Sequence, residues 1–286
     1  MIRTASKLPV TTVIGALLVA CCSSMPEAQP GCWNGAGDPA PGDVVCFSGQ
    51  LDAPLKITVG GTPEAPVVYL GDGQTIVPGI RAEADNIVIE GFISSGANST
   101  GIWASGKNVT IQGNTVTQVR RTTDDLDAIR FFGDGFRVLN NYVYDLEGSS
   151  VGDAHVDCIQ TYATNKPGSS DVLIQGNHCE GIRAQCLMAE GPNDEGGSGK
   201  GVSRNWLIQG NYCDSHAKAQ SMALEDIQDV TIANNTMVGA GNKAFALGKG
   251  TTGVVVQDNW IGPRYGRPVG FDHPSAQRGY LGPEAR

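Results

Sequence analysis

The middle of the chain holds the residues best suited to chemistry, in the string His155-Val-Asp157-Cys-Ile-Gln160. Imidazole, carboxylate and amide groups this close together are typical of a catalytic or substrate-binding turn. The alternative is a solvated turn, in which His155 and Asp157 hydrogen-bond to backbone groups. We favour the functional interpretation, and we take His155 and Asp157 as catalytic candidates.

Two acidic and two basic residues extend this set. Asp127 and Asp157 occupy matching positions in neighbouring repeats, so their carboxylates should lie close together. They could bind Ca²⁺ through oxygen ligands, or they could share one proton as an acid/base pair. Arg183 and Lys218 also match each other in position and are further catalytic candidates, since a uronate lyase needs a basic residue to remove the C5 proton and a cation beside the carboxylate. The alternative for Arg183 and Lys218 is surface charge.

The elements that must position these residues follow from an internal repeat. Seven copies of a short motif, close to N-V-x-I-x-G-N, are separated by 22 to 36 residues; they begin at Asn86, Asn108, Gly135, Asp171, Asn205, Asp229 and Gly253. A propeller blade would need about 40 residues and four strands per repeat. The spacing instead favours a solenoid in which each coil holds a few short strands.

Within one repeat, apolar and polar residues alternate as in a half-buried strand, with Val109 and Ile111 on one side. The Asn that ends the motif is expected at a sharp corner, because Asn tolerates left-handed backbone conformations. Stacked from coil to coil, these side chains would form a ladder of amides that satisfies polar groups inside the coil. The expected ladder comprises Asn114, Asn141, Asn177, Asn211, Asn235 and Asn259.

This frame, N-V-x-I-x-x-N followed by a small residue and then I-x-apolar, resembles the right-handed parallel β-helix superfamily, the pectate-lyase-like fold. The resemblance covers roughly residues 86–261. It implies an all-β chain, with a single right-handed parallel β-helix of about 8–10 coils and terminal caps over residues 32–286. The N-T-D, G-H-G and R-I-K motifs of polygalacturonase-type hydrolases and the W-x-D-H motif of many pectate lyases are absent.

The third strand of each repeat carries the pattern of a small residue followed by I-x-apolar. It should present alternate residues outward on one face, bordered by long insertions at residues 163–170 and 191–204. Aromatic rings can pack on sugars, and forked side chains can bind hydroxyls and carboxylates. We therefore expect a polysaccharide or oligosaccharide as the partner. The candidate substrate-binding residues are Arg130, Gln160, Tyr162, Gln185, Glu190 and Glu225.

Three functions fit this face. The first is a polysaccharide lyase acting on a uronate-containing glycan. The second is a glycoside hydrolase that uses paired carboxylates among Asp127, Asp157, Glu190 and Glu225. The third is a non-catalytic, glycan-binding surface protein. Charged groups of both signs on a single face favour an enzyme, and we place the lyase first.

The cysteines are expected to form disulfides. Cys32 and Cys46 flank a Gly/Pro-rich loop and should pair. Equivalent positions in neighbouring coils lie about 4.8 Å apart, within the reach of a disulfide. Cys158 and Cys186 share one inward column, and Cys179 and Cys213 share another, so we predict Cys158–Cys186 and Cys179–Cys213. Free buried thiols are the alternative.

The N-terminus resembles the signal peptide of a bacterial lipoprotein. Residues 1–20 carry two basic residues and a 13-residue apolar run, and Leu18-Val19-Ala20-Cys21 resembles a lipobox. We expect cleavage before Cys21, a lipid on its thiol, and a tether over residues 21–31. The protein would then be exported and attached to the bacterial envelope membrane, or extracellular. The net charge of −9 argues against nucleic acid as a partner, and we expect a monomer.

Overall fold

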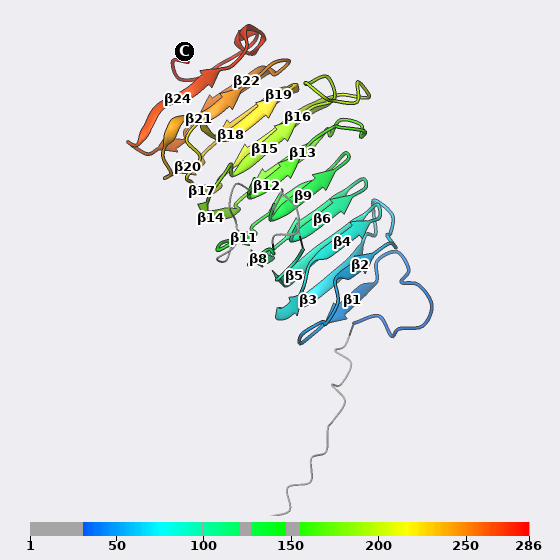
Figure 1. The fold of residues 1–286 in the computed structure, drawn as a ribbon. Coiled ribbons are helices and arrows are strands. Elements are labelled where there is room, and N and C mark those ends of the chain that lie inside the picture. Colours follow the sequence, from blue (N-terminus) through cyan, green and yellow to red (C-terminus); the bar gives the residue numbers. More distant parts are fainter. Residues whose placement is uncertain (1–30, 99, 121–126, 147–154, 286) are drawn as a thin grey trace, which may run out of the picture.

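The computed structural model describes residues 31–98, 100–120, 127–146 and 155–285, which wind into a right-handed parallel β-helix of about nine turns (Figure 1). All strand pairings between coils are parallel, and the fold class expected from the repeat is confirmed. The expectation for Cys21 and the lipoprotein signal falls outside the described residues. Among the described residues, no helix is long and apolar enough to cross a membrane.

Two sheets line the coil. The nine-stranded sheet carries the face of interest; it comprises β2 (Leu55–Ile57), β4 (Ile80–Glu83), β6 (Ile102–Ser105), β9 (Ile129–Phe132), β12 (Ile159–Thr161), β15 (Leu187–Glu190), β18 (Gln220–Glu225), β21 (Gly241–Leu247) and β24 (Tyr265–Phe271).

The fifteen-stranded sheet forms the other two sides of the coil, which join through β5 (Ile87–Ser95). One side contains β7 (Val109–Gln112), β10 (Arg137–Leu139), β13 (Val172–Gln175), β16 (Ser203–Gln209), β19 (Ile227–Ala233) and β22 (Thr252–Gln257). The other contains β8 (Thr115–Thr117), β11 (Tyr142–Val143), β14 (His178–Ile182), β17 (Tyr212–Ser215), β20 (Thr236–Met237) and β23 (Trp260–Ile261).

Both ends of the coil extend this pattern. At the N-terminal end, β1 (Val44–Phe47) pairs with β3 (Val67–Val77), as expected for first, incomplete coils. At the C-terminal end, the segment after Gly262 was expected to be an irregular cap or a loose extension. It instead adds β24 to the nine-stranded sheet before a short 3-10 helix, η2 (Pro274–Gln277), so the coil continues further than the motif does.

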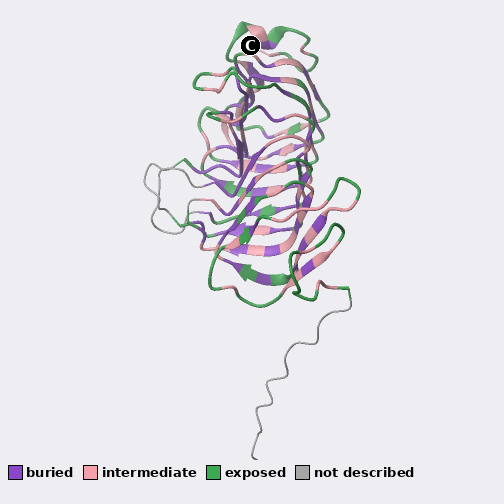
Figure 2. Cartoon of the chain, turned by 90° about the vertical axis from the view of Figure 1, so that its right-hand side faces the viewer, coloured by how far each residue is buried: buried purple, intermediate pink, exposed green. Residues whose placement is uncertain are grey.

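The alternation of the motif decides what is buried. Val109 and Ile111 are fully buried, whereas Thr110 and Gln112 between them are only half-buried. Figure 2 shows the same alternation along strands of many coils. Since each inward column is apolar from coil to coil, the coils stack on a continuous core rather than on separate ones.

The asparagine ladder is confirmed. Each ladder Asn donates from Nδ2 to Oδ1 of the next, at 2.9–3.1 Å, from Asn114 to Asn259. The same Oδ1 also accepts the backbone N–H of the preceding ladder residue. Each amide therefore both donates and accepts, and this allows the ladder to repeat without charge.

The ladder Asn was expected to take the left-handed conformation at the corner. The structure instead places that conformation at the residue before it. Gly176 (φ 67°) and Gly210 (φ 64°) take this conformation, as do Asn140 and Asn234 in other coils. Residues without a Cβ or with a short amide adopt this region most easily. The ladder Asn that follows is not among the residues with positive φ, and its amide is directed along the stack.

Three disulfides form, of which Cys32–Cys46 was predicted. The other two predicted pairs are wrong: the bonds are Cys158–Cys179 and Cys186–Cys213. The inward columns were correct, since Cys179 and Cys213 are register partners. Side chains in one column point in parallel toward the opposite wall, however, so each Cys meets the Cys that faces it across the same coil, at a Cα–Cα distance of 6.0 or 5.9 Å. Disulfides are typical of proteins that fold in an oxidising compartment, which agrees with export.

Candidate active site

The outer face of the nine-stranded sheet has a fixed order of side chains. The register pairs Arg81 with Trp103, Trp103 with Arg130, Arg130 with Gln160, and Gln160 with Met188. The outward residues of neighbouring coils therefore form a column, as the repeat predicts, and this column extends by one coil to Arg81. Candidate residues from separate repeats thus lie side by side on one rigid surface.

Asp127 and Asp157 lie just before β9 and β12, and both are fully buried. Oδ1 of Asp127 accepts the backbone N–H of Asp157 at 3.1 Å, and Oδ1 of Asp157 accepts the N–H of Gln185 at 2.7 Å. This arrangement is a short acidic ladder along the coil axis. Unlike an amide, a carboxylate cannot donate to the next member, so the charge must be balanced from the side.

Arg130 provides that balance for Asp127. Its Nε donates to Oδ2 of Asp127 at 2.9 Å, and a second guanidinium nitrogen contacts the same oxygen. Arg130 is itself only 7% exposed, with its guanidinium carbon 5.6 Å from the centroid of the Tyr162 ring. Arg130 was expected to bind substrate, but these contacts make it mainly the counter-ion of a buried carboxylate.

His155 contacts Oδ2 of Asp157, as Arg130 contacts Oδ2 of Asp127, although it does not lie in the same register position. Its Nδ1 lies 3.0 Å from Oδ2 of Asp157, and the imidazole is 47% exposed. The carboxylate can hold Nδ1–H and stabilise the imidazolium, which leaves Nε2 as the ring nitrogen that exchanges protons. A buried acid that orients a solvent-facing imidazole is the arrangement that general acid/base catalysis requires.

Two amides border this pair. Gln160 Nε2 lies 3.5 Å from Oδ2 of Asp157, and Gln185 is the residue whose N–H reaches Asp157 Oδ1. Both side-chain oxygens, Oε1 of Gln160 and Oε1 of Gln185, are buried without a hydrogen-bond partner among the described residues. Buried acceptors are normally satisfied, so each oxygen needs a donor from outside the described residues, and the substrate-binding role of Gln160 and Gln185 stays a prediction.

The two predicted basic residues lie further along the face, and both are exposed. Arg183 precedes Gln185 by two residues, one coil beyond Asp157. Lys218 precedes β18, a further coil away, which is about 10 Å from Asp157 along the column. A guanidinium stays protonated, so Arg183 is better suited to neutralising a carboxylate than to moving a proton.

Ca²⁺ is not well accommodated by these groups. Asp127, His155 and Asp157 could each offer one ligand atom, and these atoms lie within 4.8 Å of one another. The set consists of two oxygens and one nitrogen, whereas Ca²⁺ takes six to eight oxygens. All four carboxylate oxygens already contact a protein donor or the His155 ring, so Ca²⁺ would have to displace Arg130 or His155. The predicted calcium site therefore does not fit this donor set.

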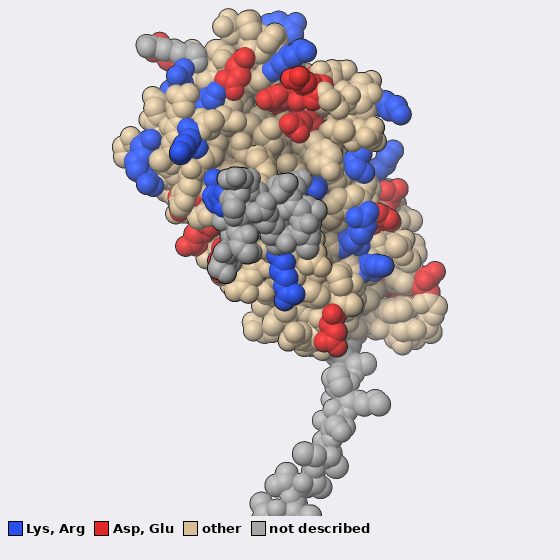
Figure 3. All heavy atoms as spheres, viewed as in Figure 1, with Lys and Arg blue, Asp and Glu red and all other residues tan. Residues whose placement is uncertain are grey.

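Glu190 and Glu225 form a second carboxylate pair at the ends of β15 and β18, where they are register partners. Burial, a hydrogen bond to Asp194 and the charges of Asp194, Glu190 and Asp272 raise the pKa of Glu225 to about 7. Figure 3 shows acidic side chains gathered toward the C-terminal coils. Glu190 lies one coil beyond His155 and at the other end of its strand, and Glu225 lies one coil further, so the candidate residues fall into two groups.

Trp103, Phe132 and Lys166 were not among the predicted site residues. The rings of Trp103 and Phe132 form a row with that of Tyr162, a predicted substrate-binding residue, with centroid distances of 5.5 Å and 4.9 Å. Lys166, from the loop after β12, lies 4.5 Å from the centroid of Phe132. The alternation of the strands could have indicated the rings, but Lys166 lies in an insertion without a repeat and carries no such signal.

No protein-family model matches the sequence, and a comparison with curated proteins finds no match either. Among solved structures, the chain is similar to a mutant of the PL6 family alginate lyase AlyGC (11% identity, TM-score 0.49, 81% of this chain and 38% of that one). It is also similar to the Dettilon tailspike protein (14%, 0.49, 85% and 60%) and to an alginate lyase from Paenibacillus sp. str. FPU-7 (15%, 0.47, 85% and 92%). The chain thus spans well under half the length of the first of these and about three fifths of the second. At such identities the function of these proteins does not carry over to this chain.

Proposed function

We propose that the protein is an exported polysaccharide lyase that cleaves a uronate-containing glycan on the outer face of the nine-stranded sheet. The observation that carries this proposal is the contact of 3.0 Å between Nδ1 of the exposed His155 and Oδ2 of the fully buried Asp157. An imidazole oriented in this way is a general base, and it lies on a face that also carries aromatic rings and cations.

The reaction assigns each group a task. Nε2 of His155 takes the proton from C5 of the uronate, and Asp157 stabilises the imidazolium that forms. The C4–O4 bond breaks as a C4=C5 double bond forms, and the leaving oxygen takes a proton from Lys218 or from water. Arg183 lies beside the sugar carboxylate and makes the C5 proton more acidic by neutralising it. Gln160 and Gln185 accept hydrogen bonds from hydroxyl groups of the sugar.

The test is to incubate the mature protein with alginate, pectate, glycosaminoglycans and neutral glycans. A lyase gives an unsaturated product, which absorbs in the ultraviolet, on an acidic polymer and not on a neutral one. We expect His155→Gln to lower kcat by about 100-fold or more, the usual contribution of a positioned acid or base. Circular dichroism should stay unchanged, because the glutamine amide can donate a hydrogen bond to Asp157 in place of Nδ1–H.

His216 provides a matched control. It forms a similar contact with Asp214, at 3.6 Å, on an exposed part of β17 and the turn after it. His216→Gln should leave kcat unchanged. Full activity of His155→Gln would exclude the proposed site, and binding of glycans without any cleavage would favour the non-catalytic alternative.

A glycoside hydrolase is the second candidate, and one observation favours it. Glu225 holds its proton near neutral pH beside its register partner Glu190, as the acid of a carboxylate pair should. In that case new reducing ends appear without ultraviolet absorbance. Glu225→Gln then abolishes activity, whereas His155→Gln does not.

A further inference from the structure

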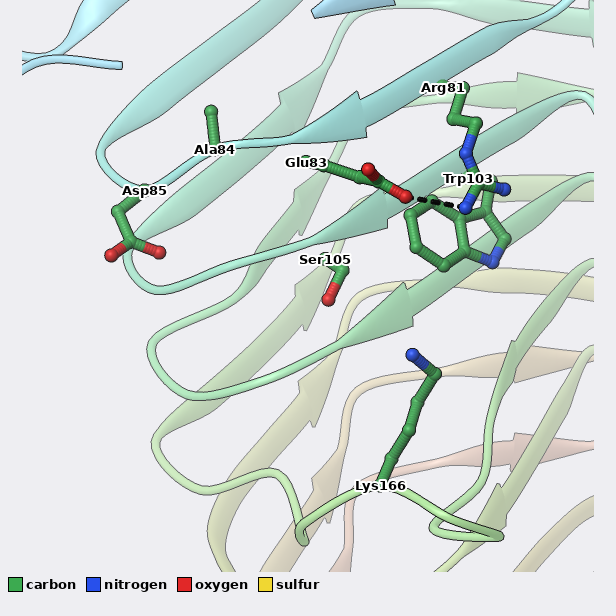
Figure 4. A pocket seen from close by; sticks show the side chains of 7 residues that line it. All are labelled: Arg81, Glu83, Ala84, Asp85, Trp103, Ser105 and Lys166. Atoms are coloured by element: carbon green, nitrogen blue, oxygen red, sulfur yellow. Dashed lines mark hydrogen bonds and ion pairs between the residues drawn. The ribbon is translucent and has the colours of Figure 1, made fainter. Parts of the chain in front are cut away.

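A hollow of about 500 Å³ opens at the N-terminal end of the same face, two coils before His155 (Figure 4). Its floor is Trp103, the register partner of Arg130, so the hollow adjoins the candidate active site without a gap. Arg81 lies over the Trp103 ring with its guanidinium carbon 4.0 Å from the centroid. Lys166 approaches the same ring from the other side, with Nζ 5.3 Å from its centroid.

Of the two cations that line the hollow, Lys166 has no carboxylate partner among the described residues. Two acids also line the hollow, but Glu83 pairs with Arg81 at 2.5 Å, and Asp85 accepts the backbone N–H of Lys107 at 2.8 Å. Within the part of the chain that the structure describes, Nζ of Lys166 lies over the rings of Trp103 and Phe132. Such contacts stabilise an exposed cation by about 0.5–1 kcal/mol, so an incoming anion would meet a positioned ammonium.

The loop that carries Lys166 is held in place by the protein. The backbone N–H of Lys166 donates to the carbonyl of Ala163 at 3.2 Å, and the hydroxyl of Ser198 donates to the carbonyl of Lys166. Ser198 belongs to the second long insertion, and its backbone N–H donates to the carbonyl of Ala163 at 2.9 Å. The two insertions therefore brace each other and hold the backbone from which the Lys166 side chain extends.

The opposite end of the face has the opposite charge. Glu190, Asp194, Glu225 and Asp272 are close enough to raise the pKa of Glu225, so a polyanion is repelled there. Toward the N-terminus, Lys56 follows Arg81 in the same outward column. Beyond Arg183 and Lys218, an acidic chain that reaches His155 is therefore repelled by the C-terminal coils and attracted toward the N-terminal ones.

We propose that Arg81, Trp103 and Lys166 form a subsite for a carboxylate-bearing sugar unit of the polymer, with the carboxylate on Lys166 and Arg81 and the sugar ring against the edge of Trp103. This inference rests on the proposed function for the identity of the polymer. It adds the direction in which the chain runs, from His155 toward β4, and a binding determinant that is separate from the chemistry.

The test measures binding rather than turnover. In the His155→Gln background, we expect Lys166→Gln to weaken the affinity for alginate-derived oligouronates about fivefold, which corresponds to about 1 kcal/mol. The dependence of affinity on salt should become less steep, because one ion pair is lost. Lys249→Gln, which makes the same charge change at an exposed position near the C-terminal end, is the matched control and should bind as the parent does.

Equal affinity of Lys166→Gln and Lys249→Gln would overturn the subsite, as would equally tight binding of neutral malto-oligosaccharides of the same length. The two proposals fail separately. If His155→Gln stays active while Lys166→Gln weakens binding, the chemistry is wrong and the subsite stands. If His155→Gln is inactive and Lys166→Gln binds normally, the subsite is wrong and the proposed chemistry stands.

Discussion

Two polar ladders run along this coil, and they differ in one atom per side chain. The asparagine ladder continues through six coils, from Asn114 to Asn259, with the same bonds at each step. The acidic ladder has two members, Asp127 and Asp157, and each requires a different partner, Arg130 or His155. An amide can pass its hydrogen bond on, whereas a carboxylate accumulates charge. The ladder that repeats from coil to coil therefore stabilises the fold, whereas the ladder that stops after two coils lies at the candidate site.

The strongest way to break this comparison is to remove the counter-ion of the acidic ladder. Arg130→Met should destabilise the fold by about 3–5 kcal/mol, because it leaves the fully buried Asp127 carboxylate without its charge partner. Urea unfolding measures the loss. The double variant Arg130→Met with Asp127→Asn should recover much of it, because a neutral amide needs no counter-ion. Equal stability of the single and double variants would contradict this account.

Removing one amide from the long ladder should have a smaller effect. Asn177→Ala leaves the N–H of Asn141 and the carbonyl of Val138 without their partners, and both are inside the coil. We expect a loss of about 2–4 kcal/mol. The control is Gln175→Ala, two residues earlier at the end of β13; its half-buried side chain points outward and accepts one hydrogen bond, from Gln209, so its loss should change stability little. A loss as small as that of the control would show that the ladder is not a main source of stability.

The smallest expected effect on stability concerns Glu225. This carboxylate belongs to neither ladder and forms no ion pair with a cation among the described residues. Its pKa is raised from 4.5 to about 7 in the folded protein, so the unfolded chain loses this proton first as the pH rises. Stability should therefore fall between pH 4.5 and 7 and then stay level. Because Glu225 is half-buried, solvent screening keeps the effect small.

Glu225→Gln should flatten that interval, with the variant at least as stable as the parent at pH 8. Urea midpoints at pH 5 and pH 8 provide the measurement. An unchanged pH dependence in the variant would mean that other groups cause it.

Much of the fold could be predicted because the repeat assigns each residue a column. The register of Trp103, Arg130 and Gln160, and the amide ladder, follow from the motif alone. The columns do not say what lies opposite, however, so the cysteines were paired along the coil axis instead of across the coil. Nor do they show that Arg130 turns back onto Asp127, three residues earlier, instead of facing a ligand.

The parts of the site that could not be predicted come from segments without a repeat. Lys166 lies in an insertion whose path depends on the second insertion, through Ser198. Burial contributes most to the raised pKa of Glu225, and Asp194 in that second insertion raises it further. Long-range contacts between irregular loops leave no periodic signal in the sequence.

The two disulfides inside the coil have a topological consequence. Cys158–Cys179 and Cys186–Cys213 each close a loop of about one coil, with sequence separations of 21 and 27 residues. The chain thus contains two stacked covalent rings, and Cys158 and Cys186 directly follow Asp157 and Gln185. A solenoid can be peeled from either end, coil by coil, but peeling stops at a closed ring. The segments inside the rings, which include Gln160 and Glu190, therefore cannot be drawn out to full length by a pulling force or an unfoldase before a reductant acts.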